Sequence, residues 1–242
     1  ETNYSGRLDA RVKDFMLNEY QPVMEALAKA GISREQFEEF LLMRHAKEAN
    51  DYYRRSKGTP DGGSGVLDAD VDEYFRTLEP ELQRKMMPIA DMIDAITHKS
   101  AQTLVEYGVE TESMIHSWFG SYQHYVPLSR DDDPVHGRII PTGFSVSGPS
   151  SARRQGGSDK PALNILANIV AQREKYIKRG EKNIIAKALY SLVKDNPNPE
   201  FWELAKPEVV PKVNVATGEL VPTLDESYKK EDMVIMSRQI GP

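Results

Sequence analysis

The chain has 242 residues, no cysteine and a formal net charge of −6, with 39% hydrophobic and 28% charged residues. This is enough chain for one large or two small folded domains. The lack of cysteine excludes disulfides, thiolate nucleophiles and cysteine-ligated metal centres. We recognise no membrane span and no signal peptide, and the acidic charge argues against a general nucleic-acid coat. Because the chain begins at Glu1 and not at methionine, we expect a fragment of a longer protein.

The first part of the chain predicts two helices joined by a short connection. Apolar residues recur with helical spacing from Arg7 to Ala30. Pro22 is expected to kink or break this helix at the residues just before it, and Gly31 to end it. The pattern Ser33-x-x-Gln36 is a capping box and opens a second helix. The short connection predicts that the two helices are antiparallel neighbours.

A glycine-rich loop follows the second helix, with the sequence Asp61-Gly62-Gly63-Ser64-Gly65. We expect at least one of these glycines to have positive φ and the loop to pack near residues 124–128. The Gly-Lys-Ser/Thr ending of a phosphate-binding P-loop is missing, and no strand precedes the loop as in a dinucleotide fingerprint. A tight connection between helices is therefore favoured over an anion site.

Further helices are predicted in the middle of the chain. Asp68 is expected to be the N-cap of a short helix. Pro80 suits the first turn of a long helix, which Pro88 should kink. Glu110 or Thr111 then begins a shorter helix.

The last part of the chain changes character twice. Residues 129–160 are rich in Gly, Pro, Ser, Asp and Arg and predict a long irregular loop. The longest helical pattern runs from Pro161 to about Asp195, and Gly180 is expected to weaken it in the middle. Residues 212–215 and 220–223, with a turn between them, predict a β-hairpin.

Together these elements predict a mainly α fold, a multi-helix bundle with long kinked helices and a small C-terminal β-hairpin. Four segments are expected: a helical bundle with the glycine loop at 1–128, a long irregular loop at 129–160, a long helix packing on the bundle at 161–199, and an extended hairpin tail at 200–242 that leads to a further domain.

No strong catalytic constellation is present, and we predict no metal, no cofactor and, on balance, no enzymatic activity. His45 and Glu48 lie one helical turn apart, and with Asp61 they define the hypothesis of a metal-assisted hydrolase. No His-Glu-x-x-His motif accompanies them. A basic cluster on the long helix and an arginine pair in the loop are either a solvated face or a nucleic-acid-binding surface, made of Arg153, Arg154, Lys175, Lys178, Arg179, Lys182 and Lys187.

A series of short motifs occurs along the chain in a characteristic order. They are Arg44-His45-Ala46-x-Glu48-x-Asn50, Asp61-Gly62-Gly63-Ser64-Gly65, His124-Tyr125-Val126-Pro127-Leu128, Arg179-x-x-x-Asn183 and Asn196-Pro197-Asn198. This series, from about Glu39 to Pro199, resembles large polyvalent-protein-associated domain 38 of bacteriophages and conjugative elements. That family usually has Glu-Arg-Asn where this chain has Glu48-Ala49-Asn50.

The resemblance implies a region of a very long polypeptide that is delivered with phage or plasmid DNA into a bacterial cell. It implies a location in the virion or in the host cytoplasm, and partners among the other domains of the same polypeptide. It implies no reaction, and it leaves a small-molecule substrate unknown. We therefore favour a non-catalytic structural or interaction module, in which Arg44 and Glu48 are internal struts that fix the second helix to the glycine loop and the Tyr125 segment. Nucleic-acid binding is the alternative.

Overall fold

The computed structural model describes residues 2–57, 63–128, 164–198, 200–205, 209–213, 220–224 and 233–236, and it is mainly helical. The chain divides into two compact units. The first unit comprises Glu1–Pro141 and Ala152–Glu181, and the second comprises Thr142–Ser151 and Lys182–Pro242. The predicted long loop and Arg153-Arg154 lie outside the described residues, as do Asp61 and Gly62.

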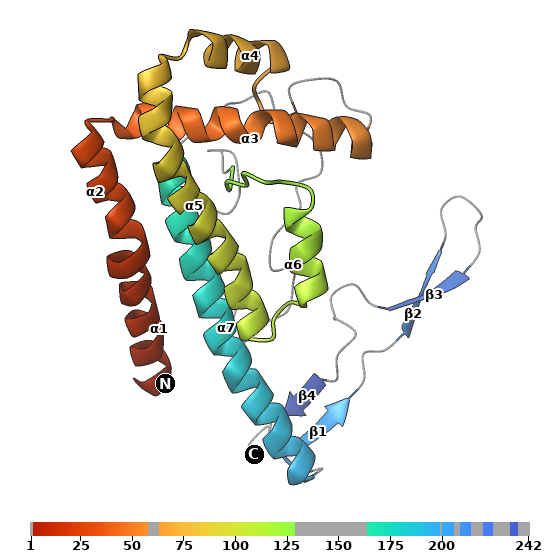
Figure 1. The fold of residues 1–242 in the computed structure, drawn as a ribbon. Coiled ribbons are helices and arrows are strands. Elements are labelled where there is room, and N and C mark those ends of the chain that lie inside the picture. The colour runs from red at the N-terminus through yellow and green to blue at the C-terminus, as the bar shows by residue number, and fades with distance from the viewer. Residues whose placement is uncertain are drawn as a thin grey trace. The chain divides into compact units, whose positions relative to one another are not determined.

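The helices are numbered in chain order in Figure 1. They are α1 (Thr2–Phe15), the π-helical turn η1 (Met16–Tyr20), α2 (Gln21–Ala30), α3 (Arg34–Lys57), α4 (Asp68–Thr77), α5 (Pro80–Glu106), α6 (Glu112–Phe119) and α7 (Ile165–Asp195). Within the first unit, α5 contacts α2, α3 and α6, and α3 also contacts α4. The long α5 therefore lies at the centre of the first unit.

The described strands belong to the second unit. Strand β1 (Trp202–Ala205) pairs antiparallel with β4 (Met233–Met236), with Trp202 opposite Met236. Strand β2 (Val209–Val213) pairs antiparallel with β3 (Leu220–Leu224), with Val209 opposite Leu224.

One hydrophobic core holds the first unit together. It draws large side chains from α1, α2, α3, α5, the segment after α6, and the start of α7, among them Phe15, Val23, Leu27, Phe37, Phe40, Leu41, Met86, Ile93, Val126, Ile165, Leu166 and Ile169. Burying a side chain of this size contributes about 1.5–3 kcal/mol. Helix α7 therefore reaches the same core as helices more than a hundred residues earlier in the sequence.

Several predicted helix boundaries are confirmed. Gly31 has the left-handed conformation, with φ of 68°, and its amide bonds to the last carbonyls of α2. Ser33 and Gln36 exchange the two hydrogen bonds of a capping box, each 3.2 Å long. Thr111 caps α6, because its side chain accepts a hydrogen bond from the amide of Met114.

Of the predicted kink or break before Pro22, the break is wrong, and the regular α-helical hydrogen bonding is interrupted there by the π-helical turn η1. The chain stays helical through η1, in which the amide of Gln21 donates to the carbonyl of Met16, five residues back. Pro22 lies at the start of α2, directly after this turn, and has no amide hydrogen to donate to it. The helix thus absorbs the proline by widening into a π-turn ahead of it.

Asp68 is not the N-cap of α4. Leu67 occupies that position, with φ of −74° and ψ of 149°, and makes no side-chain capping bond. The Asp68 carboxylate instead accepts hydrogen bonds from Asn50 and Arg54 of α3. These contacts with α3 take the place of the capping hydrogen bond that was predicted within α4.

Gly180 has a structural role that differs from the predicted weak point in α7. A Cβ at this position would lie 2.1 Å from Cδ2 of Tyr107, whose ring comes from the end of α5. Tyr107 is buried, so the ring has little room to move away. Glycine therefore permits the close approach of Tyr107 to α7.

We expect Gly180→Ala to lower the free energy of unfolding by about 1–3 kcal/mol, because overpacking outweighs the helix propensity that alanine adds. Gly6→Ala is the matched control, since nothing lies within 4 Å of a Cβ there. The control should stabilise the protein by up to about 1 kcal/mol. Urea unfolding of both variants measures this difference in sign, and equal stabilisation by the two alanines would contradict it.

Candidate functional site

The motif residues of α3 gather in a charged cluster, here called the Arg44 cluster and made of Arg44, Glu48, Asp94 and His124. Nη2 of Arg44 donates to Oδ2 of Asp94 on α5 at 2.8 Å. It also lies 2.7 Å from Nδ1 of His124, which lies 2.9 Å from the same Asp94 oxygen. The Arg44 side chain is only 5% exposed and that of Asp94 is 18% exposed. This is a largely desolvated ion pair with a histidine beside it.

Glu48 completes the cluster one helical turn further along α3. Its Oε2 accepts a hydrogen bond of 3.0 Å from the backbone amide of His124. Arg44 and Glu48 therefore hold one residue of the segment after α6, the first through its side chain and the second through its backbone. This is the arrangement that the strut hypothesis requires of the Tyr125 segment.

Tyr125 itself fastens that segment to two helices. Its hydroxyl accepts a hydrogen bond of 3.1 Å from the side-chain amide of Gln172 on α7. Its ring lies 5.8 Å, centroid to centroid, from the imidazole of His45, which also packs against Tyr122 at 5.2 Å. The sequence HYVPL thus connects α3 and α7 in the first unit.

His45 is a buried neutral histidine. It is 4% exposed, and burial lowers the pKa of its imidazole to about 4, with the charge of His124 adding to the effect and a backbone hydrogen bond with His124 opposing it. A histidine held neutral among tyrosine rings packs the interior of the protein. Nothing in this environment prepares it for proton transfer near pH 7.

The lowered pKa of His45 predicts a loss of stability in mild acid. The unfolded chain takes up a proton near pH 6.5, whereas the folded chain resists it until about pH 4. Stability should therefore fall as the pH drops through this window, by on the order of 2–3 kcal/mol. Urea unfolding at several pH values should show this slope in the original chain and a much shallower one in His45→Gln. Equal slopes would assign the acid sensitivity to other groups.

A second cluster, here called the Asn50 clamp, closes the glycine loop. Asn50 is fully buried. Its Oδ1 accepts from the amide of Ser64 at 2.8 Å, and its Nδ2 donates to the carbonyl of Val66 at 2.8 Å and to Asp68 at 3.0 Å. Arg54 holds the other Asp68 oxygen at 2.6 Å. One side-chain amide therefore satisfies the backbone on both sides of Gly65.

The glycines in this loop fit its close packing. Gly65 has φ of 95°, which confirms the expected positive φ. A Cβ on Gly63 would lie 2.8 Å from the ring of Tyr53 on α3. Val66 packs against the same core as Val126 and Leu128. The described end of the loop is thus a tight, closely held connection.

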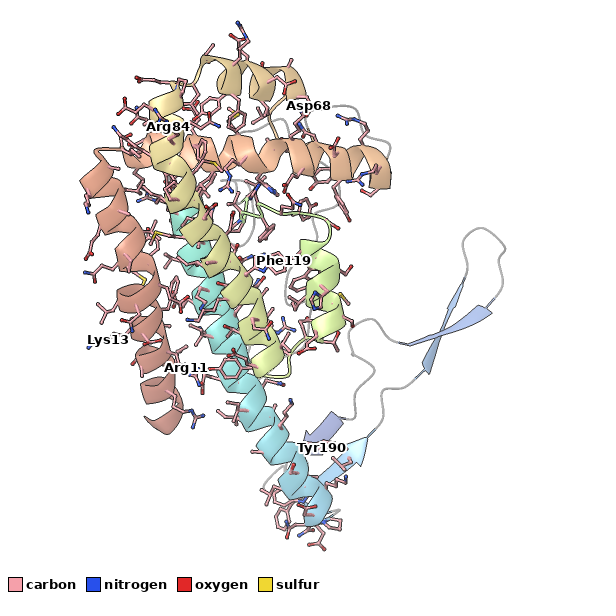
Figure 2. All side chains as sticks on the ribbon, in the orientation of Figure 1. Arg11, Lys13, Asp68, Arg84, Phe119 and Tyr190 are labelled. Carbon is pink, nitrogen blue, oxygen red and sulfur yellow. The ribbon has the colours of Figure 1, made fainter. Side chains whose placement is uncertain are left out.

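Two further polar clusters were not predicted from the sequence. Glu181 is almost completely buried and accepts from Nε of Arg7 at 2.8 Å and from the hydroxyl of Tyr107 at 2.7 Å. Arg11 lies over the Tyr107 ring, at 5.6 Å from its centroid, and Figure 2 shows Arg11 on α1. Glu181 looked like one of the acids that interleave a solvated helix face, and no local signal pairs it with Arg7.

The other cluster centres on Glu19 of the π-turn. Its Oε1 accepts from Lys99 of α5 at 2.7 Å and from Arg173 of α7 at 3.2 Å. Arg173 also donates to the hydroxyl of Thr103 at 2.7 Å, and its guanidinium lies 5.5 Å from the centroid of the Phe15 ring. Both clusters therefore connect α1 or η1 to α5 and α7 within the first unit.

The predicted basic surface is only partly described. In the first unit, Lys175 and Lys178 are exposed and Arg179 is half-buried. Although the Lys175 side chain as a whole is exposed, partial desolvation of its ammonium group and the charge of Arg179 lower its pKa. Lys182 and Lys187 belong to the second unit.

The structure offers no support for metal chemistry in its described part. No three carboxylate, imidazole or thiol side chains there could hold a metal ion. Of the residues in the hydrolase hypothesis, His45 is enclosed by tyrosines and Glu48 holds a backbone amide, while Asp61 is not described. None of the helices in the same part is both long and apolar enough to cross a membrane.

The chain was also compared with known proteins. No model of a protein family, no curated protein and no solved structure matches it.

Proposed function

We propose that this chain is a non-catalytic structural or interaction module of a large phage or mobile-element protein that is delivered with DNA into a bacterial host. The proposal rests on one observation, which is that the motif residues make their hydrogen bonds within the protein itself. Arg44, Glu48 and Asn50 direct their polar groups at other parts of their own first unit. The context of delivery comes from the resemblance of the ordered motifs to the polyvalent-protein family.

The chemistry of these side chains supports a structural role. A catalytic acid or base needs contact with a substrate and a pKa near the working pH. His45 has neither, because it is buried and its pKa is lowered to about 4. Glu48 already accepts a backbone hydrogen bond, and Arg44 is committed to Asp94. These residues can position a segment but are badly placed to transfer a proton.

The size of the native polypeptide tests the proposal. An antibody raised against this chain should detect, in cells or particles that carry the gene, a polypeptide several times larger than the 27.3 kDa of this sequence. A native product of 27.3 kDa that is absent from particles and from recipient cells would contradict the proposal.

Nucleic-acid binding is the second candidate, favoured by the exposure of Lys175 and Lys178 on α7. Anisotropy titrations with labelled single- and double-stranded DNA at low salt test it. A phosphate-driven mode requires affinity that falls steeply with salt and weakens in the double variant Lys175→Gln/Lys178→Gln. Matched substitutions at Lys13 and Lys29, on α1 and α2, provide the control. No binding at tens of micromolar, or equal losses in both variants, would exclude this mode.

A further inference from the structure

A hollow of about 230 Å³ lies between α5 and α6. It is lined by His98 and Gln102 from α5 and by Glu112, Ile115, His116 and Phe119 from α6. Figure 2 labels Phe119 on α6, and its ring stacks on His98 at 3.6 Å between centroids and 14° between planes. The volume is several times the ~30 Å³ that one water molecule occupies in the liquid. It can hold the end of a side chain.

The polar groups around this hollow are not used by the fold. The side chains of Gln102, Glu112 and His116 are exposed and make no hydrogen bond or ion pair with the described residues, and the exposed side chain of His98 makes only its ring stack. They form two pairs, His98 with Gln102 and Glu112 with His116, each spaced by one helical turn on facing helices. The Arg44 cluster and the Asn50 clamp are the opposite case, because there the polar groups bond to one another.

The chemistry of the lining selects a cationic donor. Its one acidic group is the carboxylate of Glu112, which only accepts hydrogen bonds when ionised, and beside it lie the amide oxygen of Gln102 and the aromatic faces of His98 and Phe119. A metal ion is disfavoured, because no three carboxylate or imidazole groups of the described part could hold one. A guanidinium suits the site better, since it is planar, carries five donors and stacks on aromatic faces. The carboxylate of Glu106 at the end of α5 and the net charge of −6 add long-range attraction.

We propose that this hollow is an anchor site for an arginine side chain of a basic partner segment. The guanidinium stacks on the His98–Phe119 pair, bonds to Glu112 and Gln102, and rests its methylenes on Ile115. The proposal rests on the proposed function as an interaction module, for which it names the chemistry of the partner.

A capped arginine amide, titrated into the whole chain at pH 8, is the direct probe. Citrulline amide has the same shape without the charge, and capped lysine amide has the charge without the planar fork. We expect the arginine compound to shift the NMR signals of Ile115 and of the neighbouring Trp118 indole in a saturable way. Citrulline should bind at least tenfold more weakly, and lysine severalfold more weakly.

Variants locate the site and keep the proposal falsifiable. Glu112→Gln should weaken arginine binding at least fivefold, whereas Glu81→Gln, an exposed acid at the other end of α5, should leave it unchanged. Circular dichroism checks that both variants fold. Equal binding of citrulline, or no effect of Glu112→Gln, would overturn the anchor site. This result is independent of the native polypeptide size, on which the module itself is tested.

Discussion

Replacing Asp94 by alanine is expected to lower the free energy of unfolding by about 3–5 kcal/mol, the range found when one member of a buried ion pair is removed. The reason is the guanidinium left behind. Arg44 is only 5% exposed, and its Nη2 bonds to Asp94 and to nothing else of opposite charge at that distance. Asp91 is further away, at 3.8 Å, and is 67% exposed. Without Asp94 the cation stays buried and poorly compensated.

Asp91→Ala is the matched control, with the same residue type on the same helix and the same arginine as neighbour. It should cost less than about 1 kcal/mol, as surface pairs do. A second comparison uses Arg44→Met together with Asp94→Leu, which removes both charges and should recover much of the stability lost in Asp94→Ala. Chemical unfolding of the variants measures all three effects. Equal losses for Asp91→Ala and Asp94→Ala would mean that the cluster is solvated in solution.

Asn50→Ala is expected to cost about 2–4 kcal/mol, because it removes the acceptor of a buried backbone amide as well as other contacts. Its Oδ1 accepts from the Ser64 amide, whereas the Val66 carbonyl, to which its Nδ2 donates, keeps the Ser64 hydroxyl as a second donor at 3.2 Å. An unpaired polar group in the interior costs about 1–3 kcal/mol each. Asp68 retains Arg54 as a partner and loses less.

Two variants calibrate the Asn50 result. Asn50→Asp keeps an acceptor for Ser64 but cannot donate to Val66, and it places a second carboxylate beside Asp68, so it should be as damaging as alanine. Asn18→Ala removes one exposed bond to Asp14 and should cost less than about 0.5 kcal/mol. Thermal and urea unfolding measure the series. Little loss in Asn50→Asp would show that the clamp acts through Ser64 alone.

The helical class and many of the boundaries could be predicted because they depend on local signals. The capping box of Ser33 and Gln36, the left-handed Gly31 and the Thr111 cap all act over three or four residues. Asp68 shows where this logic fails. Its side chain could have capped the start of α4, but it accepts hydrogen bonds from Asn50 and Arg54 of α3 instead.

The candidate site was predictable only in part, for the same reason. The ordered motifs identified four residues as candidates, namely Arg44, Glu48, Asn50 and His124. In the structure Arg44, Glu48 and His124 lie in one cluster. Asp94 was missed because an acid on a helix, 50 residues from its arginine, looks like any solvated acid. Gly180 was misread because the need for glycine comes from Tyr107, which lies far away in the sequence. Contacts between residues far apart in the sequence do not change the local hydrophobic pattern from which helices are predicted.

Because of the π-turn at Met16–Tyr20, the number of residues between α1 and α2 is itself a structural constraint. Phe15 and Val23 both lie in the core. At 100° per residue, an uninterrupted α-helix would turn about 800° between them and leave them about 80° out of phase. The π-turn holds one residue more than an α-helical turn, and this brings Phe15 and Val23 back to the same side of the helix. Deleting the exposed Leu17 would therefore rotate α1 about its own axis and carry Arg7 away from Glu181, although no core side chain had changed. Among related chains, substitutions at the exposed Leu17 and Asn18 should be tolerated far better than gaps within the π-turn.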